Sequence, residues 1–269
     1  SNSLLFENLD KEALYQHIKT YEDADFLRNE LENLRLIAFV AEGSILPRRS
    51  DGSSLPIEID RAVPFASPNN LKMDVELPNK GQITGMGLPR GITLIIGEFG
   101  NGKTTLLNAL EQGIYNHIPG DGREFVVSNP NSVKIRAEED RNIENVDISA
   151  FISTHSSGRN IHSFSSDNAG DYISQAANVI EAIEIGADVL LIDEDTSASN
   201  FLISEQSSSE GNTEINETIT PFVDQARNLY SGYMVSSILV IDSPDNYFDI
   251  ADFVIRMTDS DANVITFDR

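Results

Sequence analysis

Three short apolar segments dominate the pattern of hydrophobic and polar positions beyond residue 90. They are Ile92–Ile96, Asp188–Ile192 and Ser237–Ile241, and each is rich in β-branched residues and nearly continuous. Strands that helices cover on both faces of a sheet have this pattern, which is typical of sheets that contain parallel strands. The pattern therefore predicts an α/β fold with a mixed sheet flanked by helices.

The first part of the chain has a different pattern, which predicts a small α+β segment at 1–60 ahead of the main domain at 61–269. Helical spacing after Asp10, a good capping residue, predicts two helices before a strand at 36–41. The first helix rests on Ala13, Leu14, His17 and Ile18, and the second on Phe26, Leu27 and Leu31.

Turn-forming and polar segments predict where the chain leaves these elements. The segments 47–56 and 203–218 are expected to be loops, the second one mobile. From Leu71, apolar and charged residues alternate as in a half-buried strand. Gly85 and Gly87 are expected to punctuate the approach to the strand at Ile92–Ile96.

Composition excludes several classes of protein. The 269 residues include no cysteine, which excludes a disulfide scaffold and a cysteine nucleophile. There are 43 acidic against 19 basic residues, a net charge of −24 that disfavours general nucleic-acid binding. Apolar runs of four or five residues, as at 37–41, fall far short of the roughly 18 of a membrane helix. With no signal-peptide pattern at the start, we expect a cytoplasmic protein without a membrane partner.

The segment after Ile92–Ile96 has the spacing of a phosphate-binding loop, Gly-x4-Gly-Lys-Thr, and a predicted helix follows it. Glycines let successive backbone N–H groups turn toward phosphate at the positive end of a helix. Lys103 is expected to contact the β- and γ-phosphates, and the Thr104 hydroxyl to bind Mg²⁺. The predicted nucleotide contacts come from Gly97, Glu98, Phe99, Gly100, Asn101, Gly102, Lys103, Thr104 and Thr105.

Two carboxylates, Asp193 and Glu194, end the apolar strand at 189–192. Burying an unpaired carboxylate at the end of a strand costs several kcal/mol of free energy unless a cation binds it there. We assign Asp193 to the Mg²⁺ ion and Glu194 to the activation of the attacking water, because adjacent side chains of an extended strand point to opposite sides. By themselves, two acids after a strand could equally begin a solvated loop.

Residues 193–200 resemble the Walker B motif and D-loop of ABC-type ATPases, Asp-Glu-Pro-Thr-Ser-Ala-Leu-Asp, with Asp195 in place of the proline. More widely, the chain resembles the soluble family of "predicted ATPases of the ABC class". That resemblance lies in 38–49, 83–87, 115–124, 133–138, 146–149, 174–178 and 193–200. Members of the family usually extend further at both ends, so the chain corresponds to their central catalytic part. The resemblance implies a P-loop core of ABC-ATPase type that takes ATP and Mg²⁺.

The resemblance also implies a homodimer through a signature segment and the D-loop. The signature segment falls at 168–175, at the start of a helix predicted over Ser174–Ile185. Gly170–Ile173 replaces residues that should donate hydrogen bonds, which leaves Ser174 and the N–H groups of the helix start. The alternative is a helix start without any contact to a second subunit.

Two further departures bear on activity. The position that faces the γ-phosphate falls at Asp242, where ABC transporters have a histidine and this family usually has a small residue. An added acid beside Glu194 argues against fast turnover. The Q-loop stretch at 147–149 lacks its glutamine, which argues against a transporter subunit.

These observations favour an ATPase that hydrolyses Mg-ATP to ADP and phosphate and acts as a dimerising switch. The first alternative is a slow or non-hydrolytic ATP-binding module associated with nucleic acid or another partner. The second is a P-loop kinase, against which the Thr196–Ala198 stretch argues. Tyr115, Asn116, His117, Asp121 and Arg123 form a further polar cluster after the predicted helix. The histidines His117, His155 and His162 do not have the spacing of metal ligands.

Overall fold

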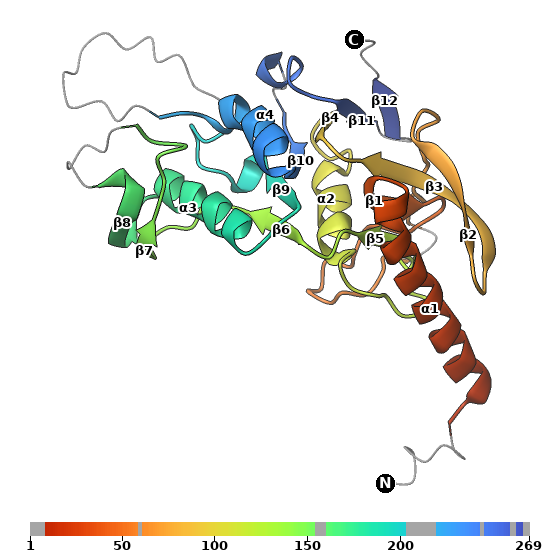
Figure 1. The fold of residues 1–269 in the computed structure, drawn as a ribbon. Helices are drawn as coiled ribbons and strands as arrows, with labels where there is room; N and C mark the ends of the chain where they lie inside the picture. The colour runs from red at the N-terminus through yellow and green to blue at the C-terminus, as the bar shows by residue number, and fades with distance from the viewer. Residues whose placement is uncertain are drawn as a thin grey trace. The chain divides into compact units, whose positions relative to one another are not determined.

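The computed structural model describes residues 9–58, 61–153, 160–202, 219–242, 245–258 and, for the backbone, 262–265. The chain divides into two compact units, and Figure 1 shows the ribbon coloured along the sequence. Unit 1 comprises residues 1–90, 99–130 and 256–266, and unit 2 comprises 91–98, 131–255 and 267–269. The domain boundary expected at residue 60 stays a prediction, and the segment 203–218 lies outside the described residues.

Unit 1 is built on a four-stranded antiparallel sheet with the order β2-β3-β1-β5. Its elements are α1 (Lys11–Asn33), β1 (Leu36–Ala41), β2 (Lys72–Leu77), β3 (Gly81–Pro89), α2 (Lys103–Gln112) and β5 (Val126–Ser128). Helix α1 packs on strands β1, β2 and β5 (Figure 1). Leu27 and Leu31 of the helix and Phe39 and Val127 of the sheet belong to one buried cluster. Burial of these apolar side chains holds the helix on the sheet.

Helix α1 corrects the prediction of two helices. It runs unbroken for 23 residues, and Asp10 caps it as expected by accepting a hydrogen bond from the Ala13 N–H at 3.1 Å. No glycine or proline interrupts the helix, so nothing breaks it. The predicted first apolar face is not buried; the buried side chains are Thr20, Asp23, Ala24, Leu27 and Leu31.

The strands of unit 1 agree with the sequence in part. Strand β1 has the predicted bounds, and β2 alternates between exposed and buried positions as expected. Gly85 and Gly87 do not punctuate the chain, because both lie inside β3 and pair with β1. Their reason is space: a Cβ atom at Gly85 would stand 2.3 Å from Phe39 Cζ.

Unit 2 contains a sheet whose inner strands are parallel. Strands β4, β10, β9 and β6 are parallel neighbours in that order, and β11 lies beside β4. The last residues of β11 and the strand β12 belong to unit 1. The elements are β4 (Ile92–Gly97), β6 (Ser132–Ile135), β9 (Val189–Asp193), β10 (Ser236–Val240), β11 (Phe253–Met257) and β12 (Ala262–Ile265).

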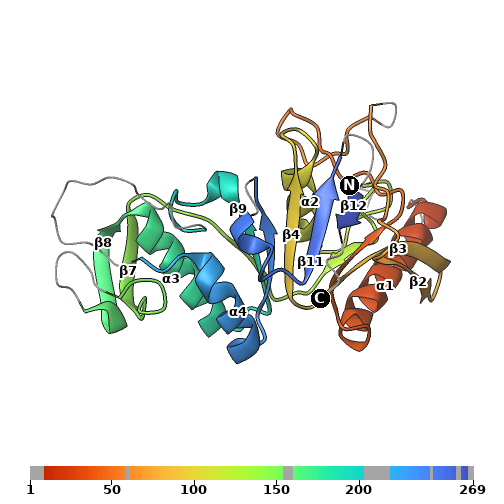
Figure 2. The same cartoon turned by 90° about the horizontal axis from the view of Figure 1, so that it is seen from above.

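Two helices and a separate two-stranded antiparallel sheet complete the described part of unit 2 (Figure 2). They are α3 (Asp171–Glu184), α4 (Phe222–Tyr233), β7 (Arg141–Val146) and β8 (Phe164–Ala169), with short 3₁₀ turns at Ile161–Ser163, Glu194–Thr196 and Asp245–Tyr247. Helix α3 starts three residues before its predicted start at Ser174. All five residues of β9 and of β10 are buried, as the apolar segments predicted. The predicted α/β fold class is thus confirmed.

Candidate phosphate-binding site

The phosphate-binding loop lies between the end of β4 and the start of α2, in the strand–loop–helix order that the sequence predicts. Gly97, Gly100 and Gly102 have φ angles of 147°, 88° and 84°, which residues with a Cβ atom rarely adopt. A Cβ at Gly100 would meet no atom within 4 Å, so backbone conformation rather than space requires this glycine. The loop thus has the backbone geometry that turns N–H groups toward an anion.

The side chains of the loop differ in exposure. Lys103, the first residue of α2, is buried with 8% of its surface exposed, whereas Phe99 is 97% exposed. Thr104 is exposed at the helix start. Asn101 donates a hydrogen bond from Nδ2 to the Met257 carbonyl at 3.3 Å, which fixes the middle of the loop within unit 1.

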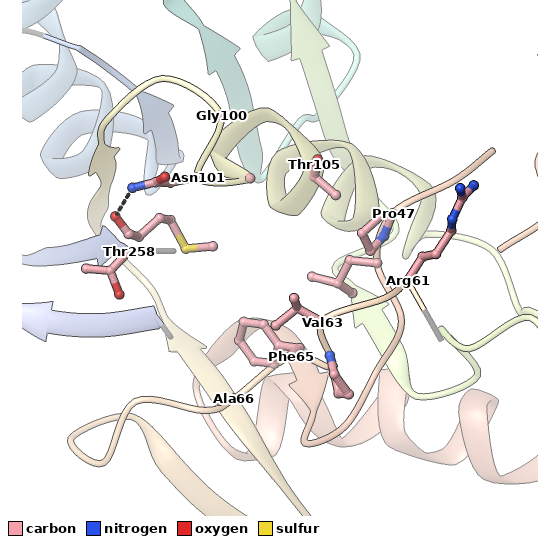
Figure 3. Close-up of a pocket in the computed structure, with 13 residues that line it drawn as sticks. Pro47, Arg61, Val63, Phe65, Ala66, Gly100, Asn101, Thr105 and Thr258 are labelled. Atoms are coloured by element: carbon pink, nitrogen blue, oxygen red, sulfur yellow. Dashed lines mark hydrogen bonds between the residues drawn. The ribbon is translucent and has the colours of Figure 1, made fainter. Parts of the chain in front are cut away.

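A pocket of about 300 Å³ adjoins the loop and the first turn of α2 (Figure 3). The residues that line it are Leu46, Pro47, Arg61, Val63, Pro64, Phe65, Ala66, Gly100, Asn101, Gly102, Thr105, Met257 and Thr258. Phe65 is held firmly, because its N–H donates to the Ser44 carbonyl and its carbonyl accepts from the Gly43 N–H, both at 2.8 Å. A mainly apolar cavity beside a phosphate-binding loop can take the flat apolar face of a nucleoside. Sequence reasoning did not find the residues at 61–66 or Met257.

The two predicted acids lie at one edge of the sheet in unit 2. In the parallel register, Ile95 of β4 pairs with Val240 of β10, and Val240 pairs with Asp193 of β9. The carboxyl ends of these three strands therefore meet at the same edge. Gly97, Asp193 and Asp242 follow or end those strands, so this edge carries both the start of the phosphate-binding loop and the acids.

Asp193 has a buried carboxylate, and one of its two oxygens lacks a hydrogen-bond donor among the described residues. Its surface is 1% exposed, and Oδ1 accepts a hydrogen bond from the Asp195 N–H at 3.3 Å. Oδ2 is buried and has no hydrogen-bond partner among the residues that the structure describes. An unpaired buried carboxylate oxygen is costly unless a cation binds it, so Asp193 fits a Mg²⁺ site. In the described part of the chain no three His, Cys, Asp or Glu side chains gather to hold a metal, so further ligands would be phosphate, hydroxyl or water.

Glu194 is tied to the segment after β10. Its Oε2 accepts a hydrogen bond from the backbone N–H of Asp242 at 2.5 Å, while the Asp242 side chain is exposed. Burial raises the pKa of the Tyr247 hydroxyl, and the charge of Glu194 contributes to that rise. Tyr247 donates its hydroxyl hydrogen to the Leu202 carbonyl at 2.7 Å. The structure thus brings Glu194 and Asp242 together, as the sequence expected.

Ser174 does not present its hydroxyl to solvent. It is fully buried; its Oγ accepts from the Glu138 N–H at 2.9 Å and donates to the Asp171 carbonyl at 2.8 Å. Gly170 and Asp171 are exposed at the start of α3, and Gly170 makes no side-chain cap. A nucleotide contact by the Ser174 hydroxyl remains a prediction that this arrangement does not favour, which leaves the backbone N–H groups of the helix start.

Tyr172 explains one departure of the signature segment. Its ring packs edge-on against Phe201 at a centroid distance of 5.5 Å, and Phe201 packs on Phe151 and Phe222. Burial raises the pKa of the Tyr172 hydroxyl, which lies 2.8 Å from the Thr220 carbonyl. In this chain Tyr172 is therefore part of an aromatic cluster.

A comparison with family models assigns most of the chain to one family. Residues 10–268 match the family model described as ABC_ATPase, P-loop domain. The chain is 30% identical over 200 residues to the uncharacterized protein MJ1628 of Methanocaldococcus jannaschii, covering 72% of this chain and 44% of the relative. It thus spans less than half the length of that relative.

Solved structures with a similar arrangement include two from ABC transport systems. One is cbiO1 from Clostridium perfringens, described as part of the ABC transporter complex cbiONQ, with 12% identity, a TM-score of 0.47 and coverage of 86% of this chain and 87% of that one. The other is a bacterial Atm1-family ABC exporter with ATP bound, with 12% identity, a TM-score of 0.43 and coverage of 84% and 38%. Among the described residues of this chain, no helix is both long and apolar enough to cross a membrane.

Proposed function

The chain belongs to the ABC_ATPase family of P-loop domains, and from this premise we propose that it binds Mg-ATP and hydrolyses it to ADP and phosphate. The observation that carries the proposal is the buried Asp193, whose Oδ2 has no partner within the described part of the chain, at the sheet edge where β4 leads into the phosphate-binding loop. A buried carboxylate without a partner calls for a cation, and a glycine loop at a helix start calls for phosphate. Together they call for a metal-bound nucleotide.

Each predicted residue has a role in this proposal. Lys103 and the N–H groups of the loop would bind the β- and γ-phosphates and stabilise the charge that develops on them. Thr104 and Asp193 would hold Mg²⁺, which neutralises phosphate charge when it is bound. Glu194 would accept a proton from the water that attacks the γ-phosphorus, and the bond to ADP would break on the opposite side.

The pocket of about 300 Å³ beside the loop supports a nucleoside triphosphate over free polyphosphate. Val63, Phe65 and Met257 offer apolar surface to a base, next to the Gly100–Gly102 backbone that would meet its phosphates. This is the side of the loop on which we place the nucleoside.

Slow turnover is the second candidate, and a specific contact favours it. The Oε2 atom of Glu194 already accepts a hydrogen bond from the Asp242 N–H, so this oxygen is occupied when the attacking water binds. The exposed Asp242 carboxylate adds negative charge where a γ-phosphate would lie. An ATP-binding module that hydrolyses little would share every binding contact with the ATPase.

We further propose that two copies pair around nucleotide through the start of α3 and the D-loop at 195–200. With Ser174 buried, the contact to the partner's phosphate would come from the backbone N–H groups of α3. Pairing and separation would then work as a cytoplasmic switch on another macromolecule rather than as part of a transporter.

Calorimetry with Mg-ATP and a phosphate-release assay test the proposal. We expect Lys103→Ala to weaken ATP binding by more than tenfold, because it removes a charge-assisted phosphate contact worth roughly 1.5–3 kcal/mol. Glu194→Gln should keep ATP binding and lose at least about 100-fold in turnover, the lower end of what general base catalysis contributes. Lys134→Ala, a change on the edge strand β6, serves as the matched loss of a lysine and should alter neither quantity.

The outcomes separate the candidates. Binding that is indifferent to both Mg²⁺ and Lys103→Ala would refute a P-loop nucleotide site. Binding that depends on both, without any phosphate release from the parent protein or from Glu194→Gln, would identify a non-hydrolytic module. Phosphate transfer to a small acceptor in place of water would identify a kinase.

A further inference from the structure

The side chain of Gln175 connects helix α3 to the turn that follows β9. Its Nε2 donates to Ser197 Oγ at 2.9 Å, and its Oε1 accepts from the Ala198 N–H at 2.8 Å. The side chain is fully buried, and both ends of its amide are used. Since a backbone N–H can only donate, the Ala198 contact fixes which end of the amide is oxygen.

The same turn sets the geometry of Asp193. Ser197 links Gln175 to the backbone of Asp193, because its Oγ donates a hydrogen bond to the Asp193 carbonyl at 2.9 Å. Thr196 Oγ1 lies 3.2 Å from the same carbonyl. The Oδ1 of Asp193 accepts from the Asp195 N–H and so caps the short 3₁₀ turn at 194–196. A turn held in this way determines the direction in which the partnerless Oδ2 points.

Besides the Asp242 N–H contact to Glu194, two contacts from other segments of the described chain hold the turn, and only one of these two is made by a side chain. The Ala137 N–H donates to the Thr196 carbonyl at 2.9 Å, a backbone contact that survives any change at residue 175. Gln175 supplies the other anchor, at Ser197 and Ala198. Loss of the Gln175 amide should therefore loosen the turn without releasing it.

We propose that Gln175 is a positioning residue that sets the affinity of the site for Mg²⁺ by holding the turn behind Asp193. The inference rests on the proposed function, since it assigns Asp193 to the metal. Groups that orient a metal ligand from behind affect metal affinity strongly, although they never touch the ion. Gln175 also lies on the buried side of α3, so hydrogen bonds join the first turns of this helix to the turn behind Asp193 within one subunit.

The test is the free Mg²⁺ concentration that gives half-maximal binding of a fluorescent ATP analogue. Gln175→Met keeps the length of the side chain and removes both hydrogen bonds, and we expect it to raise that concentration about tenfold. Binding of the analogue in EDTA should not change, because the phosphate-binding loop is intact. Ser197→Ala, at a half-buried position, removes the same link from the other side and should act in the same direction.

Controls distinguish positioning from a loss of stability. Val179→Ala truncates another fully buried side chain one turn further along α3 and should lower the melting temperature while keeping the parent's Mg²⁺ requirement. The double variant Gln175→Met with Ser197→Ala should need no more Mg²⁺ than the stronger single variant, because both changes cut one connection.

An unchanged Mg²⁺ requirement in both Gln175→Met and Ser197→Ala would overturn the inference, as would an equal shift in Val179→Ala. Neither result would contradict the proposed function if Lys103→Ala still weakens binding by more than tenfold. If the parent protein binds the analogue without any need for Mg²⁺ or Lys103, the proposed function itself is wrong.

Discussion

His117 is a largely buried histidine whose environment opposes its protonation. Its side chain is 10% exposed, Nε2 has no hydrogen-bond partner among the described residues, and Nδ1 lies 3.7 Å from Asp121 Oδ1. Burial lowers the pKa of His117, and the positive charge of Arg123 lowers it further, against the attraction of Asp121. Arg48 and Glu124 also face the imidazole, with opposite effects. The folded protein therefore holds His117 neutral.

The lowered pKa predicts a loss of stability in weak acid. The unfolded chain binds the proton first as the pH falls, so this contribution to the free energy of unfolding shrinks below about pH 6.5, the ordinary value of histidine. We expect urea unfolding between about pH 7.5 and 5.5 to show a smaller decrease for His117→Gln than for the parent protein. Equal decreases in the two proteins would show that His117 does not carry the effect.

Asp121 titrates in a different range and does not confuse that measurement. Burial alone would raise the pKa of Asp121, but the hydrogen bonds and charge of Arg123 outweigh it and lower the pKa. Arg123 Nε donates to Asp121 Oδ1 at 2.8 Å. The stability that this carboxylate contributes is present above its ordinary pKa of about 3.8 and is lost only as the pH falls below that value.

Strand β3 shows what a glycine does inside an element. Gly85 pairs with Ala41 of β1, and a Cβ there would lie 2.6 Å from the Val40 carbonyl oxygen as well as against the Phe39 ring. A backbone atom cannot move aside without disturbing the sheet. The close approach of β1 and β3 over the buried Phe39 therefore requires a residue without a side chain.

Two glycine-to-alanine substitutions should consequently have opposite signs. We expect Gly85→Ala to destabilise the protein by about 1–3 kcal/mol through overpacking. Gly232, in helix α4, has open space around it, so Gly232→Ala should stabilise by roughly 0.5–1 kcal/mol because alanine is the better helix former. Chemical denaturation of both variants measures the difference, and a neutral Gly85→Ala would contradict the packing argument.

At the scale of the whole molecule, the net charge of −24 governs how copies meet. Like charges repel over about 30 Å at 0.01 M salt and about 8 Å at 0.15 M. If two copies of the protein pair around nucleotide as we propose, raising the salt concentration over this range should strengthen the dimer that the Glu194→Gln variant forms in the presence of Mg-ATP. Sedimentation velocity measures the dimer fraction, with ADP as the control; a dimer that weakens with salt would indicate charge-paired contacts instead.

The same charge predicts weak, unspecific contact with nucleic acid at most. Phosphate neutralisation needs clustered lysine and arginine. Arg48 and Arg49 are two adjacent basic residues, but Arg48 is already bound within the protein. Arg48 donates to the Asp121 carbonyl at 2.9 Å and pairs with the Asp121 carboxylate at 3.3 Å. Arg48 therefore mainly holds its own loop against the segment around Asp121 and does not form a binding surface for a polyanion.

The sequence by itself determined the phosphate-binding motif and the places of the buried strands around it. The spacing of Gly97–Thr104, the acids at 193–194 and the three apolar strands depend on local rules, such as which residues permit a positive φ and which pattern a buried strand needs. The burial of Asp193 followed from its place at the end of such a strand. These features could be predicted because neighbouring residues decide them.

Only the tertiary structure decided which groups are already engaged. Contacts between segments far apart in the chain decide this. They turn the side chains of Ser174 and Tyr172 inward, bring Gln175 to the turn at 197–198, and let Glu194 accept a hydrogen bond from the Asp242 N–H. The half-buried path of α1 and the pocket beside Gly100 were missed for the same reason. Local pattern names the candidates, whereas long-range packing decides which side chains remain free to meet a ligand.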